Sequence, residues 1–371
     1  MKKITVLLTS VVLSFGLATA GFAADTIKLG VAGPHSGDLA PYGIPAMRAA
    51  QLVVKKINAA GGVLGKQVEL LIQDDQCKPE MATNAATKLV TDGADVVLGH
   101  ICSGATKAAL GIYKDAKIPV MSPSATNPPL TQSGDYPNFF RTIASDDMQA
   151  RLAINFTIND LGKKKIAVLH DKGDYGKGFA EFAKQFIEDS GKAEVVLFEG
   201  VTPGAMDYSS IIQKVRRENA DALIWGGYHP EASKIVSQMK RKRMKAVFVS
   251  DDGVKDDSFL KVAGEAAEGA YMTGPRDLSK NELNKAAYEE FKAEYGTDPG
   301  AFYQEGYSAA LALLNAIEQA GGTDYDKVVE ALHTKYVETP VGDIKFDSKG
   351  DAEGVGFSVY VVENGAFKEL K

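Results

Sequence analysis

Short apolar runs alternate with segments of helical period along almost the whole chain, and this alternation limits the possible folds more than any other feature. Runs such as VVLG (96–99) and IAVLH (166–170) show little polar alternation, which is typical of strands buried on both faces of a parallel sheet. Strand–helix alternation of this kind predicts an α/β fold of doubly wound layers. The predicted strands span residues 27–32, 68–73, 95–99, 119–122, 165–170, 194–199, 221–226, 246–250 and 269–273.

The segments between these strands have the spacing of amphipathic helices. Residues 179–187 place apolar side chains at i, i+3, i+4, i+7 and i+8, and residues 283–291 and 309–317 follow a similar pattern. Gly191 and Gly296 follow two of these segments, where a left-handed cap suits glycine.

The strand–helix pattern runs twice, over about residues 27–124 and again over about residues 165–273, with a turn-rich stretch between them. Each round is about the size of one domain, and a chain of 371 residues has room for two. We therefore predict two doubly wound domains.

The first residues have the pattern of a secretory signal peptide. Lys2 and Lys3 precede an uncharged stretch over 4–18, and Gly21-Phe22-Ala23 fits a small-x-small cleavage site. We predict a signal peptide over 1–23, with cleavage after Ala20 as the alternative. A signal anchor is the other alternative, because residues 4–24 are long enough to cross a bilayer. The signal peptide predicts that the mature chain is exported.

Cys77 and Cys102 are the only cysteines. Two lone cysteines in an oxidising compartment favour a disulfide. The alternative is a reactive thiol at Cys102 with His100 nearby, and that chemistry requires the cysteine to be free.

Several classes of protein fit the sequence poorly. The formal net charge of −6 argues against non-specific nucleic-acid binding. Residues 61–67 resemble a phosphate loop but place Gln67 where Ser or Thr would bind Mg²⁺, and no G-x-S-x-G pentapeptide occurs. The five histidines are scattered, without metal-ligand spacing. No catalytic residue, cofactor or metal site is therefore predicted.

Polar and aromatic residues gather at the carboxyl ends of the predicted strands, where α/β sheets bind ligands. In the first round, Ser103 can cap a helix, and hydroxyl groups follow at 122–126; in the second, Tyr175, Tyr228 and Asp252 follow strands. Each residue also has an ordinary structural role as a turn, cap or packing residue. Together they offer donors for a carboxylate, an acid for an ammonium group and apolar walls, which is what a zwitterionic amino acid needs.

A series of segments along the mature chain resembles the periplasmic leucine/isoleucine/valine-binding proteins, the solute receptors of branched-chain amino-acid ABC importers. The segments, in the order of that family, are IKLGVAGPHSGDLAPYG, INAAGGVLGKQVEL, DDQCKPE, VLGHICSGAT, SPSATNPPLT, AVLHDKGDYGKG, GGYHPE and AGEAAEG.

The resemblance implies two lobes of the type I periplasmic binding protein fold, joined by three crossings and closing on the ligand. The N-terminal lobe would comprise 25–145 plus 276–350, and the C-terminal lobe 146–275 plus 351–371. The family's disulfide matches Cys77 and Cys102. Its ligand-binding residues match Tyr42, Ser103, Ser124, Thr126, Tyr175, Tyr228, Asp252 and Phe302, with Thr126 and Ser103 on the carboxylate and Asp252 on the ammonium group.

The resemblance also implies a periplasmic, non-enzymatic receptor that is a monomer, has no cofactor and docks transiently on an inner-membrane permease. Two positions depart from the family pattern: Asp252 is one methylene shorter than the expected Glu, and Ser124 replaces a small apolar residue. The preferred side chain among Leu, Ile, Val, Ala and others stays open.

Three alternatives remain beside this interpretation. The first is a receptor of the same fold for another amino acid or a short amide. The second is an enzyme that uses Cys102–His100 or His170–Asp171. The third is a sensor or repressor, although a signal peptide stands where a repressor would carry a DNA-binding headpiece.

Overall fold

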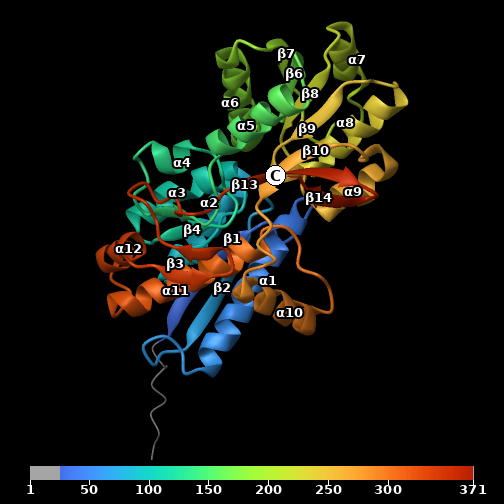
Figure 1. The fold of residues 1–371 in the computed structure, drawn as a ribbon. Helices are drawn as coiled ribbons and strands as arrows, with labels where there is room; N and C mark the ends of the chain where they lie inside the picture. The colour runs from blue at the N-terminus through green and yellow to red at the C-terminus, as the bar shows by residue number, and fades with distance from the viewer. Residues whose placement is uncertain (1–25, 371) are drawn as a thin grey trace, which may run out of the picture.

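The computed structural model describes residues 26–370, so the predicted signal peptide lies outside the described residues. Two sheets form the framework, and each is enclosed by helices (Figure 1). No helix within residues 26–370 is long and apolar enough to cross a membrane.

The first sheet has five parallel strands in the order β2-β1-β3-β4-β5. Its strands are β1 (Ile27–Gly33), β2 (Val68–Asp74), β3 (Val96–Leu98), β4 (Val120–Ser122) and β5 (Phe139–Arg141). The helices of this half of the chain are α1 (Ala40–Ala59), α2 (Pro79–Thr91), α3 (Ser103–Asp115) and α4 (Pro129–Gln132). The core contains apolar side chains of both strands and helices, including Leu29, Val97 and Leu110.

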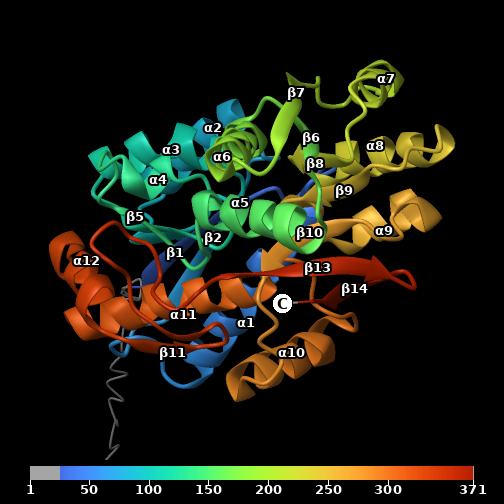
Figure 2. The same cartoon turned by 45° about the horizontal axis from the view of Figure 1, so that its top comes forward.

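Three later helices complete the first half: α10 (Glu282–Tyr295), α11 (Tyr303–Ala320) and α12 (Tyr325–Thr334). Phe291 and Leu313 belong to the same core as the first sheet, and α11 lies beside α1 (Figure 2). A short hairpin of β11 (Val337–Thr339) and β12 (Gly342–Ile344) follows.

The second sheet has seven strands in the order β14-β13-β10-β9-β8-β6-β7. They are β6 (Lys165–His170), β7 (Glu194–Gly200), β8 (Ala222–Gly226), β9 (Val247–Ser250), β10 (Tyr271–Pro275), β13 (Phe357–Glu363) and β14 (Ala366–Glu369). The helical elements around it are α5 (Asp146–Asn155), the π-helical turn η1 (Phe156–Asp160), α6 (Asp174–Ser190), α7 (Ser209–Arg217), α8 (His229–Arg241), the 3₁₀ turns η2 (Asp252–Val254) and η3 (Gly264–Ala266), and α9 (Asp257–Ala263).

Both faces of the second sheet are buried. Ile166 and Val168 face a core with α5 and α6, whereas Ala167 and Leu169 face the core that contains Trp225 and residues of α7, α8 and α9. The alternation of side chains along one strand therefore supplies two apolar faces, as the lack of polar alternation predicts.

The nine predicted strands all form, within a few residues of their predicted ends. Five further strands were not predicted from the sequence: β5, β11, β12, β13 and β14. In the second sheet, β13 pairs antiparallel with β10 and β14 antiparallel with β13, so this edge is not part of the parallel pattern. Gly191 and Gly296 cap α6 and α10 in the left-handed conformation, as predicted.

Three stretches of chain connect the two halves: residues 142–145 after β5, residues 276–281 after β10, and the segment between β12 and β13. One small cavity is lined by a residue from each stretch, namely Thr142, Arg276 and Val355, together with Glu305. The three stretches therefore lie close together. Such a set of connections is compatible with a hinge between two bodies.

Candidate ligand-binding site

A small cavity lies between the two halves, at the carboxyl ends of strands from both sheets. Its free volume is about 10 Å³, room for about one water molecule, so these walls must move apart to admit a larger ligand. Its lining residues are Tyr42, Ile101, Ser103, Ser124, Tyr175, Tyr228, Asp252, Gly253 and Phe302. Of the predicted site residues only Thr126 does not line the cavity, and its buried hydroxyl has no hydrogen-bond partner.

The first-sheet wall offers hydrogen-bond donors at the start of α3. Ser103 is the first helical residue, and its hydroxyl accepts a hydrogen bond from the Asn127 N–H at 3.3 Å. The prediction that Ser103 caps α3 is wrong, because the N-cap is Cys102, whose side chain makes no capping bond. The first amides of α3 are therefore not capped by a side chain and can bind a carboxylate.

The Ser124 hydroxyl is already engaged within the first half. It donates to the Ile101 carbonyl at 2.7 Å, and the Ser124 N–H donates to the Ser122 hydroxyl at 3.2 Å. Ser124, which stands where the family has a small apolar residue, therefore stabilises the loop between β4 and α4 through these bonds. It also places a hydroxyl at the cavity.

A disulfide joins Cys77 to Cys102 directly before α3, as predicted, with 5.5 Å between the Cα atoms. His100 is fully buried and bonded on both ring nitrogens, to Asp75 at 2.6 Å and to the Tyr113 hydroxyl at 3.1 Å. A bonded Cys102 cannot act as a free thiol, so the Cys102–His100 enzyme is wrong for this structure.

His170 and Asp171 each bind the backbone. The His170 Nδ1 accepts from the Lys172 N–H at 3.0 Å, and Asp171 accepts from the Gly173 N–H at 2.8 Å. Neither bond joins the two side chains, so the geometry offers no acid–base pair at this position.

The second-sheet wall centres on Asp252. The Tyr175 hydroxyl donates to Asp252 Oδ1 at 2.5 Å and accepts from the Gly253 N–H at 2.9 Å. The other oxygen, Oδ2, is buried without a hydrogen-bond partner. The short Asp side chain is thus held by Tyr175 and keeps one oxygen for a further donor.

Two further buried residues, Asp146 and Gln149 of α5, were missed by the sequence analysis. Both carboxylate oxygens of Asp146 and both polar atoms of the Gln149 amide make no hydrogen bond of standard geometry. The Thr126 hydroxyl and the Gln149 amide still lie near enough to lower the pKa of Asp146 and of Asp252, respectively. The Asp146 N–H donates to the Thr126 carbonyl at 2.9 Å, which places Asp146 beside Thr126. The sequence pattern that could have indicated Asp146 is the acidic first turn of the amphipathic helix α5, which follows the unpredicted strand β5.

The site is acidic, and the charges of Arg141 near Asp146 and Lys255 near Asp252 only partly offset the effect of burial on the pKa of these acids. Burial raises the pKa of Asp252, and burial together with the Asp252 charge raises the pKa of Asp146 and of Asp251. No group of three or more His, Cys, Asp or Glu side chains within residues 26–370 has the arrangement to hold a metal ion. An organic cation such as an ammonium group fits the unpaired oxygens better.

Aromatic rings form the remaining walls. The Tyr175 and Tyr228 ring centroids are 5.1 Å apart, Tyr42 and Tyr228 are 5.9 Å apart, and Tyr42 and Phe302 are 5.8 Å apart. Rings at these separations provide an apolar surface against which an aliphatic side chain can pack.

Tyr42 links the two halves directly. Its hydroxyl donates to the Gly253 carbonyl at 2.6 Å and lies 2.6 Å from His229 Nδ1, which must therefore carry the proton and donate. Both bonds are buried and both cross from α1 to the second half. A second link joins Asp174 to Lys107 and Asn127.

The family model for periplasmic binding proteins matches residues 26–366. The chain belongs to the periplasmic binding protein family. This periplasmic binding protein is 41% identical over 345 residues to a "Leucine-, isoleucine-, valine-, threonine-, and alanine-binding protein" of Pseudomonas aeruginosa, covering 93% of this chain and 92% of the relative.

Two solved structures share its fold. A leucine binding protein from Thermotoga maritima matches with a TM-score of 0.86 at 27% identity, over 93% of this chain and 98% of that chain. The branched-chain amino acid transporter substrate binding protein LivJ from Streptococcus pneumoniae, in complex with isoleucine, matches with a TM-score of 0.82 at 30% identity, over 94% and 100%. These likenesses confirm the predicted fold of this periplasmic binding protein.

Removing the Tyr42 hydroxyl should weaken the closed arrangement. We expect Tyr42→Phe to lower ligand affinity about 2- to 10-fold, the effect of losing one or two neutral hydrogen bonds between the halves. Calorimetry measures this change, with Tyr325→Phe on the remote helix α12 as the matched control. Equal affinities for Tyr42→Phe and the wild type would contradict a role for Tyr42 in closure.

Proposed function

We propose that this periplasmic binding protein captures a branched-chain or similar aliphatic L-amino acid between two closing lobes and delivers it to the permease of an ABC importer. The observation that carries the proposal is the set of buried carboxylate oxygens on Asp252 and Asp146 that lack a standard hydrogen bond, together with the uncapped start of α3 and the Thr126 hydroxyl in the first half. The oxygens suit an ammonium group, and the α3 amides suit a carboxylate.

The preference for an aliphatic side chain is supported by the aromatic walls and by the relatives. Tyr42, Tyr228 and Phe302 offer ring surfaces without a charged group of their own. The ligands after which the Pseudomonas aeruginosa protein is named, and the isoleucine bound to the Streptococcus pneumoniae protein, are all amino acids. We propose the eight predicted residues, with Asp146 and Gln149 added, as the ligand site.

The lobes in this proposal are residues 25–145 plus 276–350 and residues 146–275 plus 351–371. Ser103 and Thr126 would hold the ligand from the first lobe, whereas Tyr175, Tyr228 and Asp252 would hold it from the second. A ligand whose contacts come from both lobes has all of them only when the lobes close. The closed form would be the one recognised by the permease, and the protein would act as a monomer without catalysis.

A thermal-shift screen of the mature protein, refolded free of copurified ligand, tests the proposed ligand class. A ligand at about 100 times its Kd stabilises the native state by about 2.7 kcal/mol, which gives a clear rise in Tm. We expect leucine, isoleucine and valine to raise Tm most among the common amino acids. A larger rise with acidic or aromatic ligands, and none with these three, would contradict the proposal and favour a receptor of the same fold for another molecule.

Ligand binding should also release protons. With the walls together, burial raises the pKa of Asp146 and Asp252, whereas a bound ammonium group favours their ionised forms. Any proton that these acids carry before binding must therefore leave when the ammonium group binds, so we expect release of up to about one proton per site at pH 6 and affinity that falls as the pH falls. Calorimetry in phosphate and in a buffer of high ionisation enthalpy measures the release. Equal enthalpies in the two buffers would contradict it.

A further inference from the structure

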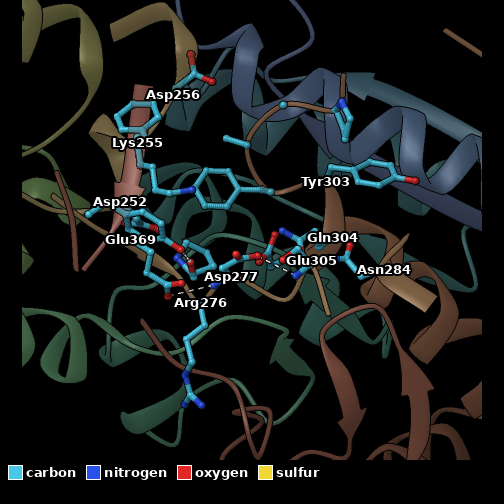
Figure 3. A pocket seen from close by; sticks show the side chains of 18 of the residues that line it. Asp252, Lys255, Asp256, Arg276, Asp277, Asn284, Tyr303, Gln304, Glu305 and Glu369 are labelled. Atoms are coloured by element: carbon cyan, nitrogen blue, oxygen red, sulfur yellow. Dashed lines mark hydrogen bonds between the residues drawn. The ribbon is translucent and has the colours of Figure 1, made fainter. Parts of the chain in front are cut away.

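A second and larger cavity (Figure 3) shares Asp252 and Phe302 with the ligand cavity and therefore adjoins it. Its free volume is about 450 Å³, within the range of small-molecule sites. Residues of both halves line it: Tyr303 and Glu305 come from α11, whereas Lys255 and Tyr360 come from the second half. Anything bound here would therefore contact both halves.

Lys255 is placed in this cavity by the backbone beside it. A Cβ at residue 274 would lie only 2.3 Å from Lys255 Cδ, so the lack of a side chain at Gly274 makes room for the lysine side chain. The ammonium group lies 4.4 Å from the centroid of the Tyr360 ring and makes no ion pair with any residue in 26–370. Burial lowers the pKa of Lys255. The lysine thus reaches the cavity as a cation that forms no ion pair, although the charges of nearby acids, Glu305 first among them, partly offset the effect of burial on its pKa.

Glu305 enters the same cavity from the opposite half. Glu305 lies in the first turn of α11 and is only 3% exposed. It forms no ion pair with any residue in 26–370. Burial raises the pKa of Glu305 to about 7. The neighbouring Gln304 Oε1 is buried and has no hydrogen-bond partner. Two acceptors are therefore available for a donor brought by a ligand.

The other charged residues of the cavity have local roles. Asp256 accepts from the Ser258 N–H at the start of α9, and Glu369 accepts from the Asp277 N–H at 3.3 Å. The Arg276 guanidinium points away from the labelled cluster in Figure 3 and donates to the Val355 carbonyl. Asp277 accepts from the Ser279 N–H, and Asp252 accepts from the Tyr175 hydroxyl. Lys255 and Glu305 remain as two opposite charges, one from each half, that form no ion pair within residues 26–370.

We propose that this cavity binds a second small zwitterion, with its carboxylate on Lys255 and its ammonium group on Glu305 and Gln304. A zwitterion matches because the two anchors have opposite charge and are farther apart than an ion pair. Since one anchor lies on each half, the bound molecule favours closure and increases affinity at the first cavity. The inference holds whichever molecule fills the first cavity.

The test titrates the leucine-saturated mature protein at pH 8 with glycine, β-alanine and 4-aminobutyrate, zwitterions of increasing charge separation. Leucine added to one equivalent fills the first cavity and keeps these probes out of it, without the excess of a zwitterion that would also fill the second cavity. We expect one of them to bind with one-to-one stoichiometry by calorimetry. Lys255→Met and Glu305→Gln should each weaken it about tenfold or more, while leucine affinity changes less than about threefold. Lys261→Met on exposed α9 is the matched control.

Three results would overturn the proposal. They are no saturable binding of any probe up to about 10 mM, equal binding of acetate or methylamine alone, and binding that both substitutions leave unchanged. Gly274→Ala, which blocks the path of Lys255, gives the same readout if Lys255→Met does not fold. Failure of the proposed function is seen separately, because it appears in the leucine titration before any probe is added. If leucine does not bind, the best ligand of the thermal-shift screen replaces it.

Discussion

Replacing Asp252 by Asn is expected to weaken leucine binding about 10- to 150-fold, or about 1.5–3 kcal/mol, the strength of a hydrogen bond to a charged group. The substitution keeps the size of the side chain and its acceptor for the Tyr175 hydroxyl. It removes the negative charge that would face the ligand ammonium. Calorimetry with the mature protein measures the loss.

Asp257→Asn is the matched control, since this exposed acid begins α9 and does not line the ligand cavity. Asp146→Asn tests whether the ammonium group is shared. If both carboxylates hold it, the double variant should lose less affinity than the sum of the single losses. Unchanged affinity in Asp252→Asn would contradict the assignment of the ammonium site.

Replacing both cysteines by serine is expected to lower the free energy of unfolding by about 3.5 kcal/mol, the chain-entropy value for a loop of this length. The bond also fixes Cys102, the N-cap residue of α3, so its loss loosens the backbone next to Ser103. Urea denaturation of the double variant and the wild type, both free of ligand, measures the change. A loss under about 0.5 kcal/mol would contradict a stabilising disulfide.

The control is the oxidation state of the wild type itself. Mass spectrometry with a thiol reagent, on protein purified from the periplasm, should detect no free thiol. Two free thiols would show that the bond does not form where the protein works.

Most of the strands that pattern alone predicted are buried on both faces, although the edge strands β2 and β7 are only partly buried. The strand β6 was predicted with its observed ends, because Ile166–Leu169 supply apolar side chains to two cores at once. The strand β13 was missed because it is set by tertiary pairing: it returns antiparallel to β10 after a long excursion through α10–α12.

The candidate site shows the same limit. Tyr42, Tyr175, Tyr228 and Asp252 could be predicted from their positions and from the resemblance, and the structure brings them around one cavity. The bond from Tyr42 to Gly253 joins residues far apart in sequence, so no local pattern indicates it. Asp146 was missed for the same reason, since its importance comes from its burial beside Thr126.

Small-angle scattering with and without leucine tests most directly whether the ligand drives closure of the two lobes. A ligand held by one lobe satisfies only its carboxylate or only its ammonium group, so the open complex is weak, whereas closure adds the missing contacts and excludes water. The radius of gyration should fall on saturation, and Thr126→Ala combined with Tyr228→Ala should reduce that fall. Identical scattering of the free and bound protein, with calorimetry showing saturated binding, would contradict closure of the lobes on the ligand.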